Sequence, residues 1–217
     1  MTNYWDLRFL RELKCEVKTI VEVGARYGTE SLTLHQVFPD AAIYSFECNP
    51  NTVEICRKNL NGVKNIFFHD VALGMEDTQL PFYSYTQNND GASSFYKRID
   101  FAATQTCTGS IRVKPLQHFI QKYNLASIDL LCMDVQGFEL EVLKGCYADI
   151  SKVKYIILEE PKPLINTQFL PDGVHSKYIL APTSAEIKQF LLKNNFQEIV
   201  RIDENFIEDN VMYKNMN

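Results

Sequence analysis

Residues 19–28 read TIVEVGARYG, and this stretch decides the class of fold. The β-branched run 19–23 is typical of a short buried strand, and Gly24 lets the backbone turn sharply where the run ends. The spacing of residues 28–37 then predicts a helix, which Gly28 lets lie close to the strand. A strand, a glycine turn and a helix in this order are the first unit of an α/β sheet.

The same alternation continues along the chain. Apolar runs and helical spacings predict further strands at 42–46, 65–69, 128–133 and 153–158, and helices at 5–14, 49–60, 115–123, 138–143 and 184–192. Two last strands, 198–202 and 206–212, are expected to pair as an antiparallel hairpin. This order predicts a mainly parallel sheet with helices on both faces, in which ligands bind beyond the carboxyl ends of the strands.

Residues 74–115 interrupt this rhythm. Short alternating stretches are separated there by polar, turn-forming residues such as Asn88-Asn89-Asp90-Gly91. We interpret the segment as an inserted flap of hairpins and loops over a ligand site. Because 217 residues suit one α/β domain, residues 1–217 are predicted to form a single domain that carries this flap.

The composition limits the kinds of partner and substrate that are expected. A net charge of −5 provides no basic field, so nucleic acid and anionic membrane surfaces are not expected, and a small or neutral substrate is favoured. The first residues lack the apolar run of a signal peptide, and the longest apolar runs are too short to span a membrane. The 6 cysteines have neither disulfide-like nor zinc-like spacing, which favours free thiols in a cytoplasmic setting. The sequence does not indicate an oligomeric state.

The glycine turn also points to a ligand. Backbone N–H groups at Gly24 can hold the carboxylate of an amino-acid-like ligand, and Glu22 can meet its ammonium group. S-adenosylmethionine (SAM) carries both groups. A dinucleotide site would need a glycine where Arg26 stands, so a nicotinamide-dependent oxidoreductase is the weaker alternative.

Carboxylates at the ends of the next two strands fit a nucleoside. Glu47 follows the second strand and can accept hydrogen bonds from both ribose hydroxyls, with Cys48 beside it near the base. Asp70 follows the third strand and can accept the adenine amino hydrogen, with Val71 packing on the ring. A turn or helix cap explains Asp70 equally well.

A second group of acids follows the fourth and fifth strands. Asp134 lies where the ligand crevice is expected, whereas Glu139 sits at a helix start and is predicted to be structural. Glu159 and Glu160 follow the next strand and border the same crevice. Such carboxylates suit either a general base or a divalent cation with oxygen ligands.

Three stretches resemble the FkbM family of SAM-dependent methyltransferases: the loop from Glu22 to Gly28, Asp70-Val-Ala-Leu-Gly, and Asp134-Val-Gln-Gly-Phe-Glu-Leu-Glu-Val-Leu-Lys-Gly. The last stretch is the most specific, and Gln136 stands there in place of the family's usual glutamate. The resemblance covers residues 19–159. It implies a Rossmann-like class I methyltransferase fold with a seven-stranded sheet, and O-methylation of a hydroxyl, often on a sugar or a polyketide.

The resemblance also implies roles for individual residues. Its cofactor loop matches Glu22, Gly24 and Gly28, with Ala25 and Tyr27 predicted to bind the cofactor alongside them, its ribose acid matches Glu47, and its signature acid matches Asp134. The stretch ending in Ser94 resembles a serine-bearing stretch near cofactor or substrate, and Gln136 of the signature is likewise expected at the cofactor. Gln117-His118 stand where the family commonly has an aspartate-led helix start, so they receive no role.

These observations predict a SAM-dependent O-methyltransferase that acts on a small-molecule or saccharide hydroxyl. Methyl transfer is an in-line displacement, so the protein mainly positions the two reactants, and a carboxylate that takes the hydroxyl proton adds roughly 10²–10⁴-fold. Asp134 is the predicted base, helped by Glu159. Mg²⁺ held by Asp134 and the Glu159-Glu160 pair is one alternative, and a SAM-binding module without turnover is another.

Overall fold

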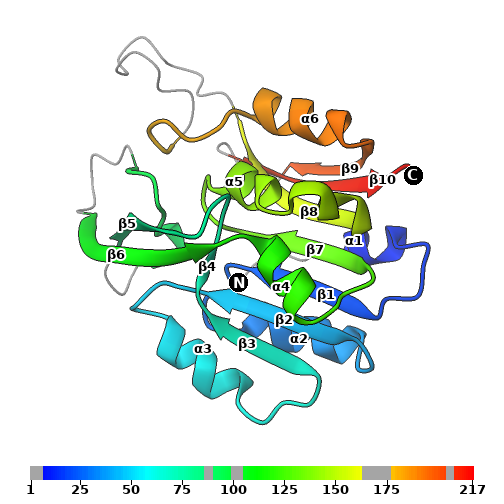
Figure 1. Ribbon diagram of the computed structural model, residues 1–217, viewed down its shortest axis with the longest axis horizontal. Helices are drawn as coiled ribbons and strands as arrows, with labels where there is room; N and C mark the ends of the chain where they lie inside the picture. The colour runs from blue at the N-terminus through cyan, green and yellow to red at the C-terminus, as the bar shows by residue number, and fades with distance from the viewer. Residues whose placement is uncertain (1–6, 86–89, 99–104, 163–176, 204–207) are drawn as a thin grey trace.

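A central sheet organises the chain. The structure is a computed structural model and describes residues 7–85, 90–98, 105–162, 177–203 and 208–217, without the side chains of Leu7, Arg8 and Arg11. Strands join in the order β3-β2-β1-β7-β8-β10-β9 (Figure 1). They are β1 (Thr19–Val23), β2 (Ala42–Glu47), β3 (Ile66–Asp70), β7 (Ile128–Met133), β8 (Val153–Pro161), β9 (Phe196–Asp203) and β10 (Glu208–Asn215).

The directions of these strands confirm the predicted Rossmann-like fold. The five strands from β3 to β8 are parallel, and β10 pairs antiparallel with β8 on one side and with β9 on the other. β8 continues to Pro161, beyond the predicted end at 158, because the chain keeps pairing with β10 there. Parts of the predicted helix 5–14 and strand 206–212 lie outside the described residues.

Helices cover both faces of the sheet. Leu34 of α2 packs with Ile20 and Ile43 on one face, whereas Leu116 of α4 packs with Val21 on the other. Figure 1 shows α4 and α5 in front of the sheet and α2 behind it. The α-helices of the described residues are α1 (Leu7–Glu12), α2 (Thr29–Val37), α3 (Val53–Leu60), α4 (Leu116–Lys122), α5 (Glu139–Lys144) and α6 (Ser184–Lys193).

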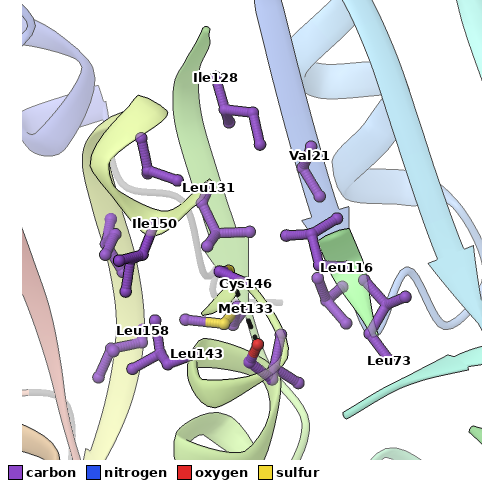
Figure 2. Close-up of a cluster of buried hydrophobic side chains, with 14 of the residues drawn as sticks. Val21, Leu73, Leu116, Ile128, Leu131, Met133, Leu143, Cys146, Ile150 and Leu158 are labelled. Carbon is purple, nitrogen blue, oxygen red and sulfur yellow. Dashed lines mark hydrogen bonds between the residues drawn. The ribbon is translucent and has the colours of Figure 1, made fainter. Parts of the chain in front are cut away.

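The larger core cluster lies between the sheet and α4 and α5. Figure 2 shows Val21, Leu131 and Met133 of the strands together with Leu143 and Cys146, all of them buried. Because side chains alternate along a strand, the residues between them in sequence pack on the opposite face. Burial on both faces explains why the parallel strands read as continuous apolar runs.

Three strands between residues 72 and 114 form a second, smaller sheet. Its strands are β4 (Ala72–Leu73), β5 (Thr78–Ser84) and β6 (Thr106–Lys114), joined in the order β4-β6-β5. β6 pairs antiparallel with β5 and parallel with β4. This sheet extends to one side of the central sheet (Figure 1) and lies largely in residues 74–115, the segment interpreted as an inserted flap; we call that segment the flap.

Two glycines allow the start of the flap to lie close to the end of α5. A Cβ on Gly145, which follows α5, would lie 2.0 Å from the carbonyl oxygen of Gly74 at the start of the flap. Gly145 has a φ of −68°, so glycine is needed there for close approach and not for a left-handed turn. The predicted helix end at this position is therefore confirmed, with a different physical reason.

Two further observations concern the surroundings of the chain. In the described ranges, no helix is both long and apolar enough to cross a bilayer. All six cysteines are free thiols, of which Cys56, Cys132 and Cys146 are buried.

Candidate functional site

A cavity of about 680 Å³, open to solvent, lies at the carboxyl ends of β1, β2 and β7, between them and the flap. The wall comes from four segments: Val23, Gly24, Arg26; Phe46, Glu47, Cys48, Asn49, Thr52; Val71, Ala72, Leu73, Phe82, Asp90, Gly91, Ser93, Phe95; and Asp134, Val135, Gln136, Phe138. Its position follows the rule that open α/β sheets bind ligands beyond their carboxyl strand ends.

The glycine turn after β1 forms one end of the cavity. Gly24 has a φ of 89°, and a Cβ on it would lie 2.0 Å from the backbone oxygen of Asp134, so this position requires glycine. The N–H groups of Gly24 and Ala25 donate to Phe46 O at 2.9 and 3.0 Å. These groups are thus engaged within the protein, whereas the sequence analysis expected them to face a ligand. Of the predicted loop residues, Gly24 lies in the wall, whereas Ala25, Tyr27 and Gly28 are not part of it.

Glu47 lies in the wall and is held by the backbone. Its Oε2 accepts from Arg26 N at 2.6 Å, and its Oε1 accepts from Cys48 N at 2.7 Å and Asn49 N at 2.6 Å. Burial raises the pKa of Glu47 to about 7, although the three N–H donors act in the opposite direction. The Thr52 side chain also interacts with this carboxylate, so a ligand hydroxyl that binds Glu47 would share its oxygens with these donors.

Glu22 lies under α2 and outside the cavity wall. It is 2% exposed and accepts hydrogen bonds from the hydroxyls of Ser31 and Ser45, the latter at 3.1 Å. Burial raises its pKa to about 7, and within the described residues its Oε1 has no hydrogen-bond partner. Its predicted contact with a ligand ammonium stays a prediction.

An ion pair joins the glycine turn to the flap, and the sequence patterns did not indicate it. Arg26 donates from Nε at 3.0 Å and from Nη2 at 2.5 Å to Asp90 Oδ1, and Tyr27 donates its hydroxyl to Asp90 Oδ2. Gly91 lets the guanidinium lie close, since a Cβ there would be 3.1 Å from Arg26 Cζ. Tyr27 therefore binds a residue of the flap. Asp90 itself is a buried carboxylate in the cavity wall.

The other predicted nucleoside contacts divide into two groups. Cys48 and Val71 lie in the wall. Asp70 is half exposed, outside the wall, and its Oδ2 accepts from Arg57 Nη2 at 2.6 Å. Ser94 is buried behind the wall, where its hydroxyl donates to Gln136 O at 2.7 Å; its neighbour Ser93 lines the cavity.

Asp134 lies in the wall at the end of β7. The amide nitrogen of Gln136 donates to Asp134 Oδ1 at 2.6 Å and to Glu159 Oε2 at 3.1 Å. Burial raises the pKa of Asp134 to about 6 and raises that of Glu159 well above its usual range. The structure thus brings together Asp134, Gln136 and Glu159, as two carboxyl groups bridged by one amide.

Glu160 points away from this pair. Successive residues of β8 face opposite sides of the sheet, so Glu160 meets α6 and β9 instead. It accepts from Ser184 Oγ at 2.6 Å and Arg201 Nη2 at 2.9 Å, and also from the Tyr213 hydroxyl. Among the described residues no group of three or more His, Cys, Asp or Glu could hold a metal ion.

The strand order and the cavity at the strand ends define the class of fold: a Rossmann-like α/β domain with a ligand cavity at its carboxyl strand ends. The N-terminal domain of EvdMO1, solved in the presence of S-adenosylhomocysteine (SAH) and D-fucose, has this fold with a TM-score of 0.54. The two chains are 12% identical, over 100% of this chain and 84% of that one.

The family follows from the sequence comparison. The Methyltransferase FkbM domain matches residues 22–198, and the chain belongs to this family. NoeI of Sinorhizobium fredii, a 2-O-methyltransferase, is 24% identical over 154 residues, which cover 64% of this chain and 62% of NoeI. Methyltransferase 1 of Beauveria bassiana is 30% identical over 143 residues, which cover 58% and 57%. The chain therefore spans less than two thirds of the length of these curated relatives.

Proposed function

We propose that this protein transfers a methyl group from SAM to a hydroxyl of a small-molecule or saccharide acceptor. The observation that carries the proposal is the single cavity wall shared by Glu47 and Asp134, which stand at its β2 and β7 ends. Two relatives support the choice of acceptor: NoeI is a 2-O-methyltransferase, and EvdMO1 was solved with SAH and D-fucose.

The wall fits the parts of SAM. Glu47 accepts hydrogen bonds and suits the ribose hydroxyls, while Cys48 and Val71 suit the adenine ring. The turn at Gly24 suits the amino-acid end, and the guanidinium of Arg26, which pairs with Asp90, lines the wall beside it. When bound, SAM supplies a methyl group on a sulfonium that is already activated.

Asp134 is the proposed base. As the acceptor oxygen bonds to the methyl carbon, the C–S bond breaks, its electron pair stays on sulfur, and the hydroxyl proton passes to Asp134. A positioned carboxylate contributes roughly 10²–10⁴-fold, and alignment of the two reactants contributes more. Glu159 acts behind Asp134 and is not itself in the wall of the main cavity.

The residues do not fit the predicted Mg²⁺ site. The Gln136 amide nitrogen, a hydrogen-bond donor and no metal ligand, stands between Asp134 and Glu159, and Glu160 faces the opposite side of the sheet. The proposal therefore includes no metal step. Membership of a methyltransferase family also disfavours the nicotinamide-dependent alternative.

Two measurements test the proposal. Calorimetry should detect binding of SAM and SAH and no binding of NADH. Transfer of a radiolabelled methyl group from SAM should then be measured on a panel of neutral saccharides and polyketide alcohols. Binding of SAH without transfer to any acceptor would favour a binding module, and absence of SAH binding would overturn the proposal.

A further inference from the structure

One side chain, Gln136, contacts both carboxyl groups at the β7 end of the cavity. Its Nε2 donates to Asp134 Oδ1 at 2.6 Å and to Glu159 Oε2 at 3.1 Å. We propose that Gln136 is a positioning residue that stabilises one negative charge on this pair, with Asp134 as the ionised member facing the main cavity. The inference rests on the proposed function only where Asp134 acts as the base.

The orientation of the Gln136 amide is determined by its other contacts. Its Oε1 lies 2.7 Å from the Tyr178 hydroxyl, whose single proton is shared with Ala92 O at 2.9 Å. On the other side an ionised carboxylate can only accept, so the amide nitrogen faces the carboxyl pair. Its backbone oxygen accepts from Ser94 Oγ at 2.7 Å, and its φ of 54° is uncommon for a residue other than glycine. Contacts from Tyr178 and from the flap therefore hold the amide against the pair.

The charge balance allows one negative charge on the pair. Two buried carboxyl groups this close cannot both ionise easily. Lys177, whose charge favours ionisation of both carboxyl groups, already forms an ion pair with Glu208, so it neutralises little of the remaining charge. Glu139 adds a further carboxyl group, held by N–H donors from Val135 at 3.2 Å and Gly137 at 3.3 Å.

The two members of the pair are not equivalent. The shorter Gln136 hydrogen bond goes to Asp134, and a stronger donor favours the ionised form of its acceptor. In agreement, burial raises the pKa of Asp134 only to about 6 but raises that of Glu159 well above its usual range. The negative charge therefore resides on Asp134 near neutral pH.

Gln136 also separates two cavities. Asp134 lines the main cavity, whereas Glu159 lines a smaller one of about 280 Å³ with Lys177, Tyr178 and Glu208, and Gln136 lines both. The charge that Gln136 places on Asp134 is thus directed at the main cavity, where the proposed acceptor hydroxyl loses its proton.

A titration that needs neither cofactor nor acceptor tests this role. The carboxyl carbons of ¹³C-labelled protein are followed by NMR against pH, and Asp134→Asn and Glu159→Gln identify the two signals. Gln136→Met keeps the size of the side chain and removes both donors, so the lower titration should move up by about one pH unit. Tyr178→Phe should move it less, and Gln79→Met, on the exposed part of β5, should leave it unchanged.

The outcomes separate this inference from the proposed function. A shift in Gln136→Met supports the inference even when calorimetry finds no SAH binding. An unchanged titration in a folded Gln136→Met protein overturns it, because a merely structural role would lower the melting temperature alone. Should Gln136→Met not fold, Gln136→Asn gives the same test, since its amide is one methylene too short to serve both carboxyl groups.

Discussion

The two ends of the main cavity hold their carboxyl groups in different ways. At the β2 end, Glu47 accepts three backbone N–H groups, whereas at the β7 end Asp134 and Glu159 share one side-chain amide. Backbone donors are placed by the path of the chain and survive most substitutions. A side-chain donor depends on its rotamer and on its own partners. The backbone therefore positions the carboxyl group at the proposed cofactor end, whereas a few side chains position the carboxyl groups at the proposed acceptor end.

Gly24→Ala should disturb both ends of the cavity, because Gly24 lies against the backbone of Asp134. The new Cβ would lie 2.0 Å from Asp134 O at a φ of 89°, so the turn and the β7 end cannot both keep their places. We expect a loss of about 4 kcal/mol in the free energy of unfolding, measured with urea, together with loss of SAH binding. Gly62→Ala is the control, since its φ is 77° with no atom within 4 Å, and it should lose only about 1–2 kcal/mol. Equal losses in both would contradict the close packing.

Asp134→Asn should separate chemistry from binding at the β7 end. The amide cannot take the acceptor proton, so methyl transfer should fall by roughly 10²–10⁴-fold while SAH affinity stays within about twofold. Glu160→Gln is the matched control, because Glu160 faces α6 and β9 and should affect stability without changing the rate per folded molecule. Full turnover in Asp134→Asn would refute its role as the base.

Glu47→Gln should weaken the β2 end. Its new NH₂ group would face backbone donors that now meet carboxylate oxygens, and the ligand would lose a charged acceptor. We expect SAH affinity, measured by calorimetry, to fall by about 10–100-fold. Asp70→Asn tests the rival prediction of an adenine contact. Since Asp70 pairs with Arg57 outside the wall, the SAH affinity of Asp70→Asn should hardly change. A fall as large as that of Glu47→Gln would instead support the adenine contact.

The pH dependence of transfer should show the smallest effect. Burial raises the pKa of Asp134 to about 6, and only the ionised form accepts a proton. The rate under saturating substrates should therefore rise about tenfold from pH 5 to pH 7 and then level off. A profile that is flat over this range, with chemistry rate-limiting, would argue against Asp134 as the titrating base.

Local sequence signals predicted the fold well, and they indicated that Gly24 and Glu47 follow strands at the edge where the cavity lies. The strand 19–23, the turn at Gly24 and the helix after it are encoded within about twenty residues, and the acid at Glu47 follows a strand of its own. The ion pair between Arg26 and Asp90 joins residues 64 positions apart, so no spacing along the chain indicates it. The same holds for the contacts of Gln136 with Tyr178 and Glu159.

Two differences could have been anticipated from strand alternation. Val21 and Val23 face the core cluster under α4, so Glu22 between them must point to the opposite face, away from the cavity wall. In the same way, Glu159 and Glu160 are neighbours on β8 and cannot face one site together. The apolar run that predicts this strand ends at 158, so both acids were expected in a loop, where they could face one site.

The position of β10 has a consequence for how the chain is made. β9 precedes β10 in sequence, yet its only neighbour in the central sheet is β10, which lies between it and β8. During synthesis, β9 leaves the ribosome before β10, the strand that pairs with it. At about 5–20 residues per second, it waits of the order of a second with its backbone groups unpaired in that sheet. The earlier strands have their partners by then, so this edge is the last part of the sheet to assemble on a nascent chain.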